Sequence, residues 1–255
     1  MVGGRAGKLR QRGVVRLDSS THWDQIGNEI HVWHAELDRE GQLLGQLEAT
    51  LSPEEIARAD RFHFANDRKR FVVARGLLRE LLGAYLHLAP AGLEFAYGKH
   101  GKPSLSGGNA LSGLCFNLSH SAGLVVYAVA RKRNLGVDVE HVQPDSAGED
   151  IARRYFSARE VSDLQTLPPE ARAEGFFHCW TRKEAYLKAT GMGLQIPLDN
   201  FAVSLLPGQP VQFLGGVEPR WHLAAYHPAE GYVAAVVYDG GPTSIRYFSV
   251  DAHLK

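Results

Sequence analysis

Cysteine is scarce in this sequence, and its scarcity excludes two classes of site. The 255 residues include Cys115 and Cys179 alone, too few for a disulfide framework or for a cysteine-ligated zinc site. No run of about 18 apolar residues occurs, so no membrane span is predicted. The segment from Met1 to Gly13 is basic and glycine-rich, without the apolar stretch of a secretion signal. These absences favour a soluble, cytoplasmic protein.

An excess of charge of either sign is also lacking. The 28 lysines and arginines equal the 28 aspartates and glutamates, and the pI is near 7.2. A protein that neutralises a polyanion usually carries a basic excess, and no basic-aromatic stacking motif is present. Nucleic acid is therefore not expected as a partner. Hydrophobic residues make up 44% of the chain, enough for a buried core.

Hydrophobic periodicity and capping residues indicate a chain of mixed helices and strands. The sequences Ser52–Glu55 and Ser157–Glu160 have the spacing of capping boxes, which begin helices. Asn117–Ser121 is expected to form a polar turn ahead of a buried strand, and residues 104–113 a loop. Apolar periodicity predicts helices over 67–86 and 170–190, and strands over 29–37, 124–129, 135–140, 221–226, 232–238 and 244–250.

The two halves of the chain faintly repeat each other. Glu55–Arg58 in the first half resembles Asp150–Arg153 in the second, and both His120 and His227 precede a valine-rich strand. We therefore predict an α+β fold of two similar lobes, a pseudo-dimer in one chain. Each lobe is expected to be a small, mainly antiparallel sheet packed with helices, with the active site in the cleft between them. The expected division is a flexible arm over 1–20, a first lobe over 21–132 and a second over 133–255.

Two carboxylates lie on one face of the strand expected over 135–140. Asp138 and Glu140 alternate with Val137 and Val139, so the carboxylates lie roughly 6–7 Å apart along the strand. Oxygen ligands suit magnesium, and a divalent cation would relieve the repulsion between the two charges. A half-buried strand with a solvated acidic face explains the same pattern without a metal.

A second group of candidates follows one face of the helix expected over 170–190. Trp180, Glu184 and Lys188 are spaced by four residues and so form one stripe. Glu184 can complete a three-carboxylate site, and Lys188 can meet a phosphate. The alternative is a surface Glu–Lys pair with Trp180 in the core.

A third group has side chains suited to phosphate or ribose. Short polar side chains and a histidine ahead of a buried strand can surround a phosphate, and basic residues can meet its charge. Hydrogen-bonded turns and solvated surface charge explain the same residues without a ligand. The candidates are Asn117, Ser119, His120, Lys99, Lys102, Arg58 and Arg75.

Four motifs occur together in an order that resembles one protein family. They are Gly101–Pro103, Phe116–Ser121, Gly136–Glu140 and Trp180–Lys188. Over roughly residues 50–240 the chain resembles the surfactin-synthetase-activating type of 4′-phosphopantetheinyl transferase. The resemblance implies that the phosphopantetheine arm of coenzyme A moves to a serine of an apo acyl or peptidyl carrier protein. Adenosine 3′,5′-bisphosphate would be released.

The resemblance also implies roles for the candidate residues. Asp138, Glu140 and Glu184 would hold magnesium against the pyrophosphate of coenzyme A. Glu184, or a water that it orients, would accept the serine proton, and Lys188 would neutralise pyrophosphate oxygens. Glu55 departs from the basic residue that some members carry. The residues implied to bind coenzyme A elsewhere are Ser119, His120, Asn117, Lys99, Lys102, Arg75 and Arg58.

The carrier protein is expected to dock beside residues 141–165. There Arg153, Arg154 and Arg159 can form a basic rim around apolar anchors such as Tyr155 and Phe156; for Phe156, plain packing of a short helix is the alternative. The chain is expected to be a monomer. Two rival functions stay open: a magnesium-dependent nucleotide pyrophosphohydrolase, and a non-catalytic module that binds carrier proteins.

Overall fold

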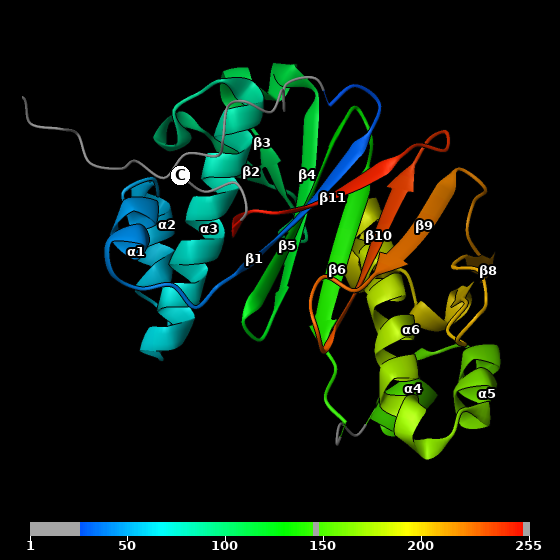
Figure 1. Ribbon diagram of the computed structural model, residues 1–255. Coiled ribbons are helices and arrows are strands. Elements are labelled where there is room, and N and C mark those ends of the chain that lie inside the picture. The colour runs from blue at the N-terminus through cyan, green and yellow to red at the C-terminus, as the bar shows by residue number, and fades with distance from the viewer. Residues whose placement is uncertain (1–25, 145–147, 252–255) are drawn as a thin grey trace, which may run out of the picture.

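The computed structural model describes residues 26–144 and 148–251 (Figure 1). The helices are α1 (Gly41–Glu48), α2 (Pro53–Ala59), α3 (Ala65–Leu86), α4 (Gly148–Tyr155), α5 (Ala158–Thr166) and α6 (Pro169–Thr190). The strands are β1 (Ile30–Glu36), β2 (Phe95–Tyr97), β3 (Pro103–Leu105), β4 (Leu114–Ser121), β5 (Leu124–Arg131), β6 (Leu135–His141), β7 (Ala202–Val203), β8 (Phe213–Gly215), β9 (Trp221–Tyr226), β10 (Tyr232–Asp239) and β11 (Ile245–Ser249). The arm predicted over residues 1–20 lies outside the described residues.

Two sheets lie face to face between two long helices (Figure 1). The first sheet has the strand order β11-β1-β5-β4 and carries α3 on its outer face. The second has the order β6-β10-β9 and carries α6 on its outer face. Neighbouring strands are antiparallel except β1 and β11, which are parallel. The predicted α+β class, with small and mainly antiparallel sheets, is confirmed.

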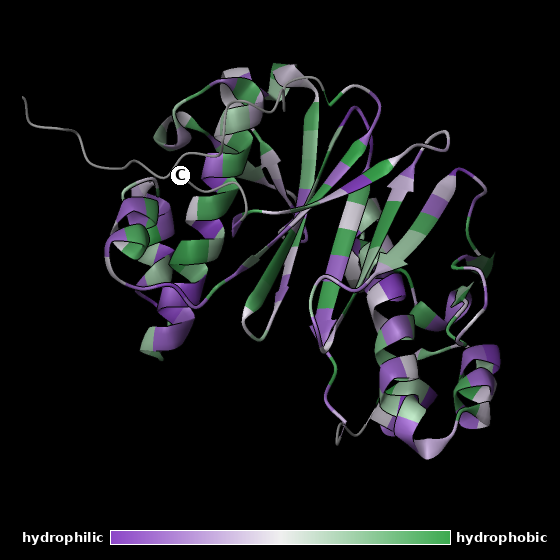
Figure 2. Cartoon of the chain, viewed as in Figure 1, coloured by the Kyte–Doolittle hydropathy of each residue, from purple (hydrophilic) through white to green (hydrophobic). Residues whose placement is uncertain are grey.

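Strand β5 shows how this layering accounts for a continuous apolar run. Val125, Tyr127 and Val129 belong to the core between the first sheet and α3. The alternate residues, among them Val126 and Ala128, belong to the core between the two sheets. Because both faces of the strand are buried, both sets of positions must be apolar. In Figure 2 hydrophobic residues, in green, recur along the strands of both sheets, with hydrophilic residues between them.

Most of the predicted elements agree with the structure. Both capping boxes are present, at Ser52 and at Ser157. Helix α6 ends where Gly191 adopts the left-handed conformation, with φ of 68°, which glycine tolerates best. Helices α1 and α4 were not predicted, and part of the predicted loop 104–113 is a 3₁₀ helix over Gly107–Ser112.

The predicted turn at Asn117–Ser121 is wrong, because this segment is the end of strand β4. It pairs with β5, and the chain reverses at Ala122 and Gly123. The polar side chains that suggested a turn bind the neighbouring strand β6. The Asn117 side chain accepts the N–H of Val137 at 2.9 Å, and the Ser121 hydroxyl accepts the N–H of His141 at 3.1 Å.

The last strand, β11, returns to the first half of the chain. It pairs in parallel with β1, from Ile30 with Ile245 to His34 with Ser249. Residues 245–249 therefore add an edge strand to the sheet that β1, β4 and β5 form.

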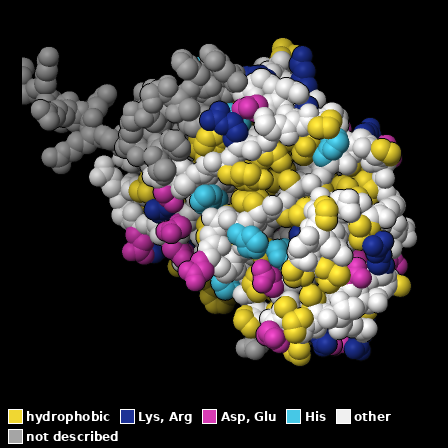
Figure 3. Space-filling model, turned by 45° about the vertical axis from the view of Figure 1, so that its right-hand side comes forward, with side chains coloured by type: hydrophobic (Ala, Val, Ile, Leu, Met, Phe, Trp, Pro, Cys, Tyr) yellow, Lys and Arg dark blue, Asp and Glu magenta, His cyan; other side chains and the backbone are white. Residues whose placement is uncertain are grey.

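Among the described residues, no helix is both long and apolar enough to cross a membrane. Figure 3 shows hydrophobic side chains interspersed with charged, histidine and other residues on one face.

Gly136 is the point at which β6 touches the backbone of α6. A Cβ atom at this position would lie 2.2 Å from the carbonyl oxygen of Ala185 and 2.3 Å from the amide nitrogen of Ala189. Because these are helix backbone atoms, the clash can be relieved only by moving α6. We expect Gly136→Ala to lower the free energy of unfolding by about 1–3 kcal/mol or more, measured by urea denaturation.

Gly45→Ala is the matched control for this substitution. Gly45 lies in α1, and a Cβ there would meet nothing within 4 Å. Alanine should raise the free energy of unfolding at this helical position by about 0.5–1 kcal/mol. Equal effects of the two alanines would contradict the close contact between β6 and α6.

Candidate active site

A cavity of about 870 Å³ brings together most of the predicted site residues. One wall comes from α2 and α3, and the opposite wall from β4, β6 and α6. Its volume lies in the range of small-molecule sites. The predicted residues that line it are Arg58, Arg75, Ser119, His120, Asp138, Glu140, Glu184 and Lys188.

The three carboxylates reach this cavity because one face of β6 is turned toward α6. Gly136 contacts α6 directly, and Asp138 and Glu140 follow at two-residue intervals on the same side of the strand. Glu184 and Lys188 stand one turn apart on α6. Two segments distant in the sequence thus present acidic side chains to one cavity.

Asp138 is the most buried of the three carboxylates, with 3% of the residue exposed. Its Oδ1 accepts hydrogen bonds from the Ser119 hydroxyl at 2.8 Å and from the Lys188 ammonium at 2.6 Å. Its Oδ2 is buried and has no hydrogen-bond partner. An unsatisfied carboxylate oxygen is costly in a buried position, and a cation at this oxygen would remove the cost.

Burial and neighbouring negative charge together raise the pKa of the other two carboxyls. Burial raises the pKa of Glu184 above its ordinary value, and the charge of Asp138 raises it further. Burial also raises the pKa of Glu140, against the lowering effect of its hydrogen bond from Ser121. A positive charge beside these carboxyls would favour their ionised forms. Lys188, whose ammonium also donates to the Ser119 hydroxyl at 2.7 Å, supplies one such charge.

Helices α2 and α3 contribute three arginines, Arg58, Arg70 and Arg75, to the lining of the cavity, together with Asp67. Arg58 is exposed, and its guanidinium lies 5.3 Å from the centre of the Phe71 ring. Arg70 also lines the cavity and forms an ion pair with Asp38. A carboxylate-rich wall facing an arginine-bearing wall suits a ligand that binds a metal at one end and exposes anionic groups at the other.

Arg75 on this wall is held by a buried acidic partner. Its guanidinium contacts the carboxylate of Glu55 and donates to the hydroxyl of Tyr97 at 2.7 Å. Glu55 also accepts from Arg79 at 2.7 Å. Burial acts to raise the pKa of Glu55, but the hydrogen bond from Arg79 and the charge of Arg75 outweigh this effect. The pKa of Glu55 therefore lies below its ordinary value. The acidic residue at position 55 therefore neutralises part of the charge of Arg75.

A smaller adjoining cavity, of about 230 Å³, is lined in part by the loop around Lys102. The Lys102 ammonium donates to the carbonyl oxygens of Leu135 and Ala189, each at 3.0 Å. Burial lowers the pKa of this lysine to about 8. Lys102 thus joins the loop to β6 and to the end of α6. Lys99 is exposed and lines neither of these two cavities.

In the segment expected to dock a carrier protein, some apolar side chains are buried and others are exposed. Phe156 is buried, and its ring stacks on that of Phe176 with centroids 5.3 Å apart, so the packing alternative holds for this residue. Ile151 and Tyr155 are exposed on α4 beside Arg154. Residues 145–147 of the segment lie outside the described residues.

Tyr97 contributes to the cavity but is not among the candidates that the sequence offers. It lines the cavity and binds Arg75, and in the pairing of β2 with β3 it lies opposite Pro103 of the motif Gly101–Pro103. Trp180 also lines the cavity, on the face of α6 that its four-residue spacing from Glu184 predicts.

Comparison with known proteins gives one consistent family. A model of the 4′-phosphopantetheinyl transferase superfamily matches residues 134–237, and a model of a 4′-phosphopantetheinyl transferase N-terminal region matches residues 39–132. The 4′-phosphopantetheinyl transferase HetI of Nostoc is 43% identical over 215 residues, 84% of this chain and 90% of that protein. The 4′-phosphopantetheinyl transferase Sfp of Bacillus subtilis is 32% identical over 187 residues, 73% and 81% of the two chains.

Proposed function

The chain belongs to the 4′-phosphopantetheinyl transferase family, and from that premise we propose how its own residues perform the transfer. The reaction moves the phosphopantetheine arm of coenzyme A to a serine hydroxyl of an apo carrier protein, with release of adenosine 3′,5′-bisphosphate. The named relatives are transferases, which counts against the pyrophosphohydrolase and the non-catalytic module considered above.

The observation that carries the proposal is the convergence of Asp138, Glu140 and Glu184 on one cavity wall. The donor set fits Mg²⁺, which prefers carboxylate oxygens, and the buried Oδ2 of Asp138, which has no hydrogen-bond partner, could bind such a cation. These three residues would hold the metal, which when bound neutralises pyrophosphate charge and polarises phosphorus. Burial raises the pKa of Glu140 and of Glu184, and a bound cation would favour the ionised form of both carboxyls.

Proton transfer from the attacking serine falls to Glu184. It lies on the cavity wall one helical turn from Lys188, and it accepts the proton directly or through a water that it orients. Lys188 places its ammonium beside Asp138 and Ser119, where it can neutralise a pyrophosphate oxygen. Ser119 and Ser121 hold the carboxylates of β6 by hydrogen bonds at 2.8 Å and 2.6 Å.

The nucleotide end of coenzyme A is assigned to the basic side of the cavity. Arg58 is the exposed cation there, while Arg75 is oriented by Glu55 and Tyr97. His120 lines the same cavity from β4. Lys102 acts by holding its loop against β6 and α6, and Asn117 by joining β4 to β6.

We also infer that the two halves form a pseudo-dimer with the active site in the cleft between them. Helices α3 and α6 each have 22 residues and cover the outer faces of the two sheets. The cavity draws residues from α2 and α3 on one side and from β6 and α6 on the other. A site built this way needs both halves of the chain.

Intact mass spectrometry of a carrier domain tests the function directly. The full chain is incubated with coenzyme A, Mg²⁺ and an apo carrier domain, with a chelator in a parallel sample. The carrier should gain one phosphopantetheine unit in the Mg²⁺ sample only. Cleavage of coenzyme A at the same rate without carrier would instead support the pyrophosphohydrolase, and no reaction in either sample would support the non-catalytic module.

Carrier docking is assigned to the exposed face of α4. Ile151, Arg154 and Tyr155 are three and four residues apart, so they share one side of the helix. An apolar anchor beside a cation suits an acidic helical partner. We expect Ile151→Ser and Arg154→Glu each to raise the KM for the carrier by about 5- to 30-fold, measured by steady-state kinetics.

The KM for coenzyme A should not change in these two variants, because α4 does not line the cavity. Arg246→Glu, an exposed charge reversal on β11, serves as the control and should leave both constants unaltered. If both α4 variants keep the carrier KM of the parent, the carrier docks elsewhere.

A further inference from the structure

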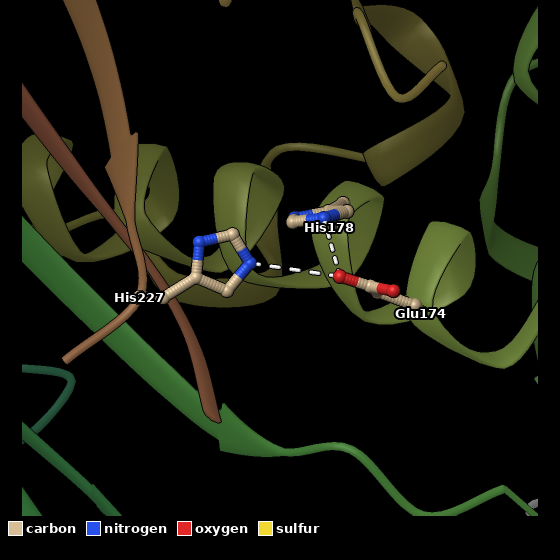
Figure 4. Close-up of side chains that lie close together, drawn as sticks. All are labelled: Glu174, His178 and His227. Carbon is tan, nitrogen blue, oxygen red and sulfur yellow. Dashed lines mark ion pairs between the residues drawn. The ribbon is translucent and has the colours of Figure 1, made fainter. Parts of the chain in front are cut away.

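A second group of metal-ligating side chains lies outside the cavity. Glu174 and His178 are four residues apart on α6, and His227 follows the end of β9. Figure 4 shows both imidazole rings directed at the carboxylate of Glu174. The Nε2 atom of His178 lies 3.5 Å from Glu174 Oε1, and so does the Nε2 atom of His227. None of the three residues lines the large cavity.

These separations match the edges of a tetrahedral metal site. Zinc bonds to nitrogen and carboxylate oxygen at about 2.0–2.2 Å, so two ligand atoms of a tetrahedron lie about 3.4 Å apart. Both histidine-to-glutamate separations are 3.5 Å. One ligand atom from each residue lies within 4.8 Å of the other two. The third edge would therefore close by no more than about 1.4 Å, a movement available to the exposed side chain of His227.

We propose that Glu174, His178 and His227 form a binding site for Zn²⁺ or a similar transition-metal ion. Two imidazoles and one carboxylate suit this class of metal, whereas Mg²⁺ favours oxygen ligands alone. The ring planes of the two histidines are perpendicular, at 88°, with centroids 5.5 Å apart, so the rings do not stack face to face and obstruct the ion. Glu174 and His227 are exposed, which leaves the fourth position open to water.

The proposed ion would connect the second sheet to helix α6. His227 begins the turn between β9 and β10, and α6 carries the other two ligands together with Glu184 and Lys188. Bound zinc would fix this turn against the helix and so favour the folded state. At a zinc concentration a hundredfold above its Kd, the Tm should rise by roughly 5–10 °C.

Zinc binding is measured on the full chain after removal of metals with a chelator. Mg²⁺ is added in excess to occupy the carboxylates of the cavity, and Zn²⁺ is titrated against a chromophoric chelator. We expect one zinc per chain. His227→Gln and Glu174→Gln should each weaken zinc binding by at least 10- to 100-fold. Loss of a residue that only supports a metal ligand already costs about this much, and these two residues are proposed to bind the metal directly. The control is His63→Gln, an exposed histidine between α2 and α3.

Two further readouts separate this site from the carboxylates of the cavity. Co²⁺ in a four-coordinate nitrogen and oxygen site gives a visible absorption band, which His227→Gln should abolish and Asp138→Asn should retain. Phosphopantetheine transfer with Mg²⁺ should be unchanged in His227→Gln. Zinc affinity that is equal in the parent, His227→Gln and Glu174→Gln would overturn the proposal. Loss of the zinc site in Asp138→Asn alone would do the same, because it would place the ion in the cavity.

Discussion

Glu184→Gln is expected to lower kcat/KM for phosphopantetheine transfer by about 10³-fold, within the range that loss of one electrostatic catalytic group costs. Glutamine keeps the size of the side chain but removes the negative charge that we propose binds the metal and accepts the serine proton. The fold should persist, because Glu184 is only partly buried and its pKa is raised by burial and by the neighbouring charge of Asp138. Neutralisation therefore relieves repulsion. Carrier mass gain measures the rate, and urea denaturation checks stability.

Glu170→Gln is the control on the same helix. Glu170 is exposed in the first turn of α6, so its loss changes the net charge by the same amount without touching the cavity. A Mg²⁺ titration adds a second readout: the variant at position 184 should need more Mg²⁺ for half of its remaining activity. Transfer at the parental rate in Glu184→Gln would remove this residue from the site, and the three-carboxylate assignment with it.

The alignment of the carboxylates within each element was predictable because it depends on two local periods. Alternation along β6 places Asp138 and Glu140 on the face of Gly136, and the four-residue spacing on α6 places Glu184 with Lys188. These two periods do not predict that the face of β6 contacts the face of α6. That contact rests on Gly136, which lets β6 approach the backbone of α6.

Residues whose partners are distant in the chain were less predictable. Polar residues in Asn117–Ser121 favour a turn locally, yet the segment is a strand because its backbone pairs with β5. The side chains of Asn117 and Ser121 hydrogen-bond to β6, 20 residues further along the chain. Glu55 was recognised as acidic at an unusual position, but its pairing with Arg75 and Arg79 spans α2 and α3. Sequence spacing within one element carries no information about such pairs.

Lys183 illustrates the same limit within the motif Trp180–Lys188. It is one residue from Glu184 and faces away from the cavity, with 0% of its side chain exposed. Its ammonium donates to the carbonyl oxygens of Leu198 and Phe201, each at 2.6 Å, and to Glu160 at 2.8 Å. Glu160 in turn accepts from the backbone N–H of Val203 at 2.8 Å. This network joins α5, α6 and the segment that leads into β7.

Lys183→Met is expected to lower the free energy of unfolding by about 3–5 kcal/mol, the cost of leaving a buried charge without its partner. Methionine fills a similar volume but leaves the buried carboxyl group of Glu160 without its ion-pair partner and two carbonyl oxygens without a donor. The measurement is urea denaturation of the full chain. The exposed pair of Lys69 and Glu40, 2.9 Å apart, provides the comparison: Lys69→Met should cost no more than about 1 kcal/mol.

The double variant Lys183→Met with Glu160→Gln separates charge from packing. If the uncompensated carboxylate causes most of the loss, neutralising it should recover part of the stability, since neutral replacements of buried ion pairs are often tolerated. Glutamine cannot restore the bonds to Leu198 and Phe201, so recovery should stay incomplete. A double variant no more stable than Lys183→Met would assign the loss to those two carbonyls, and the charge of Glu160 would then have little weight in holding α5 against α6.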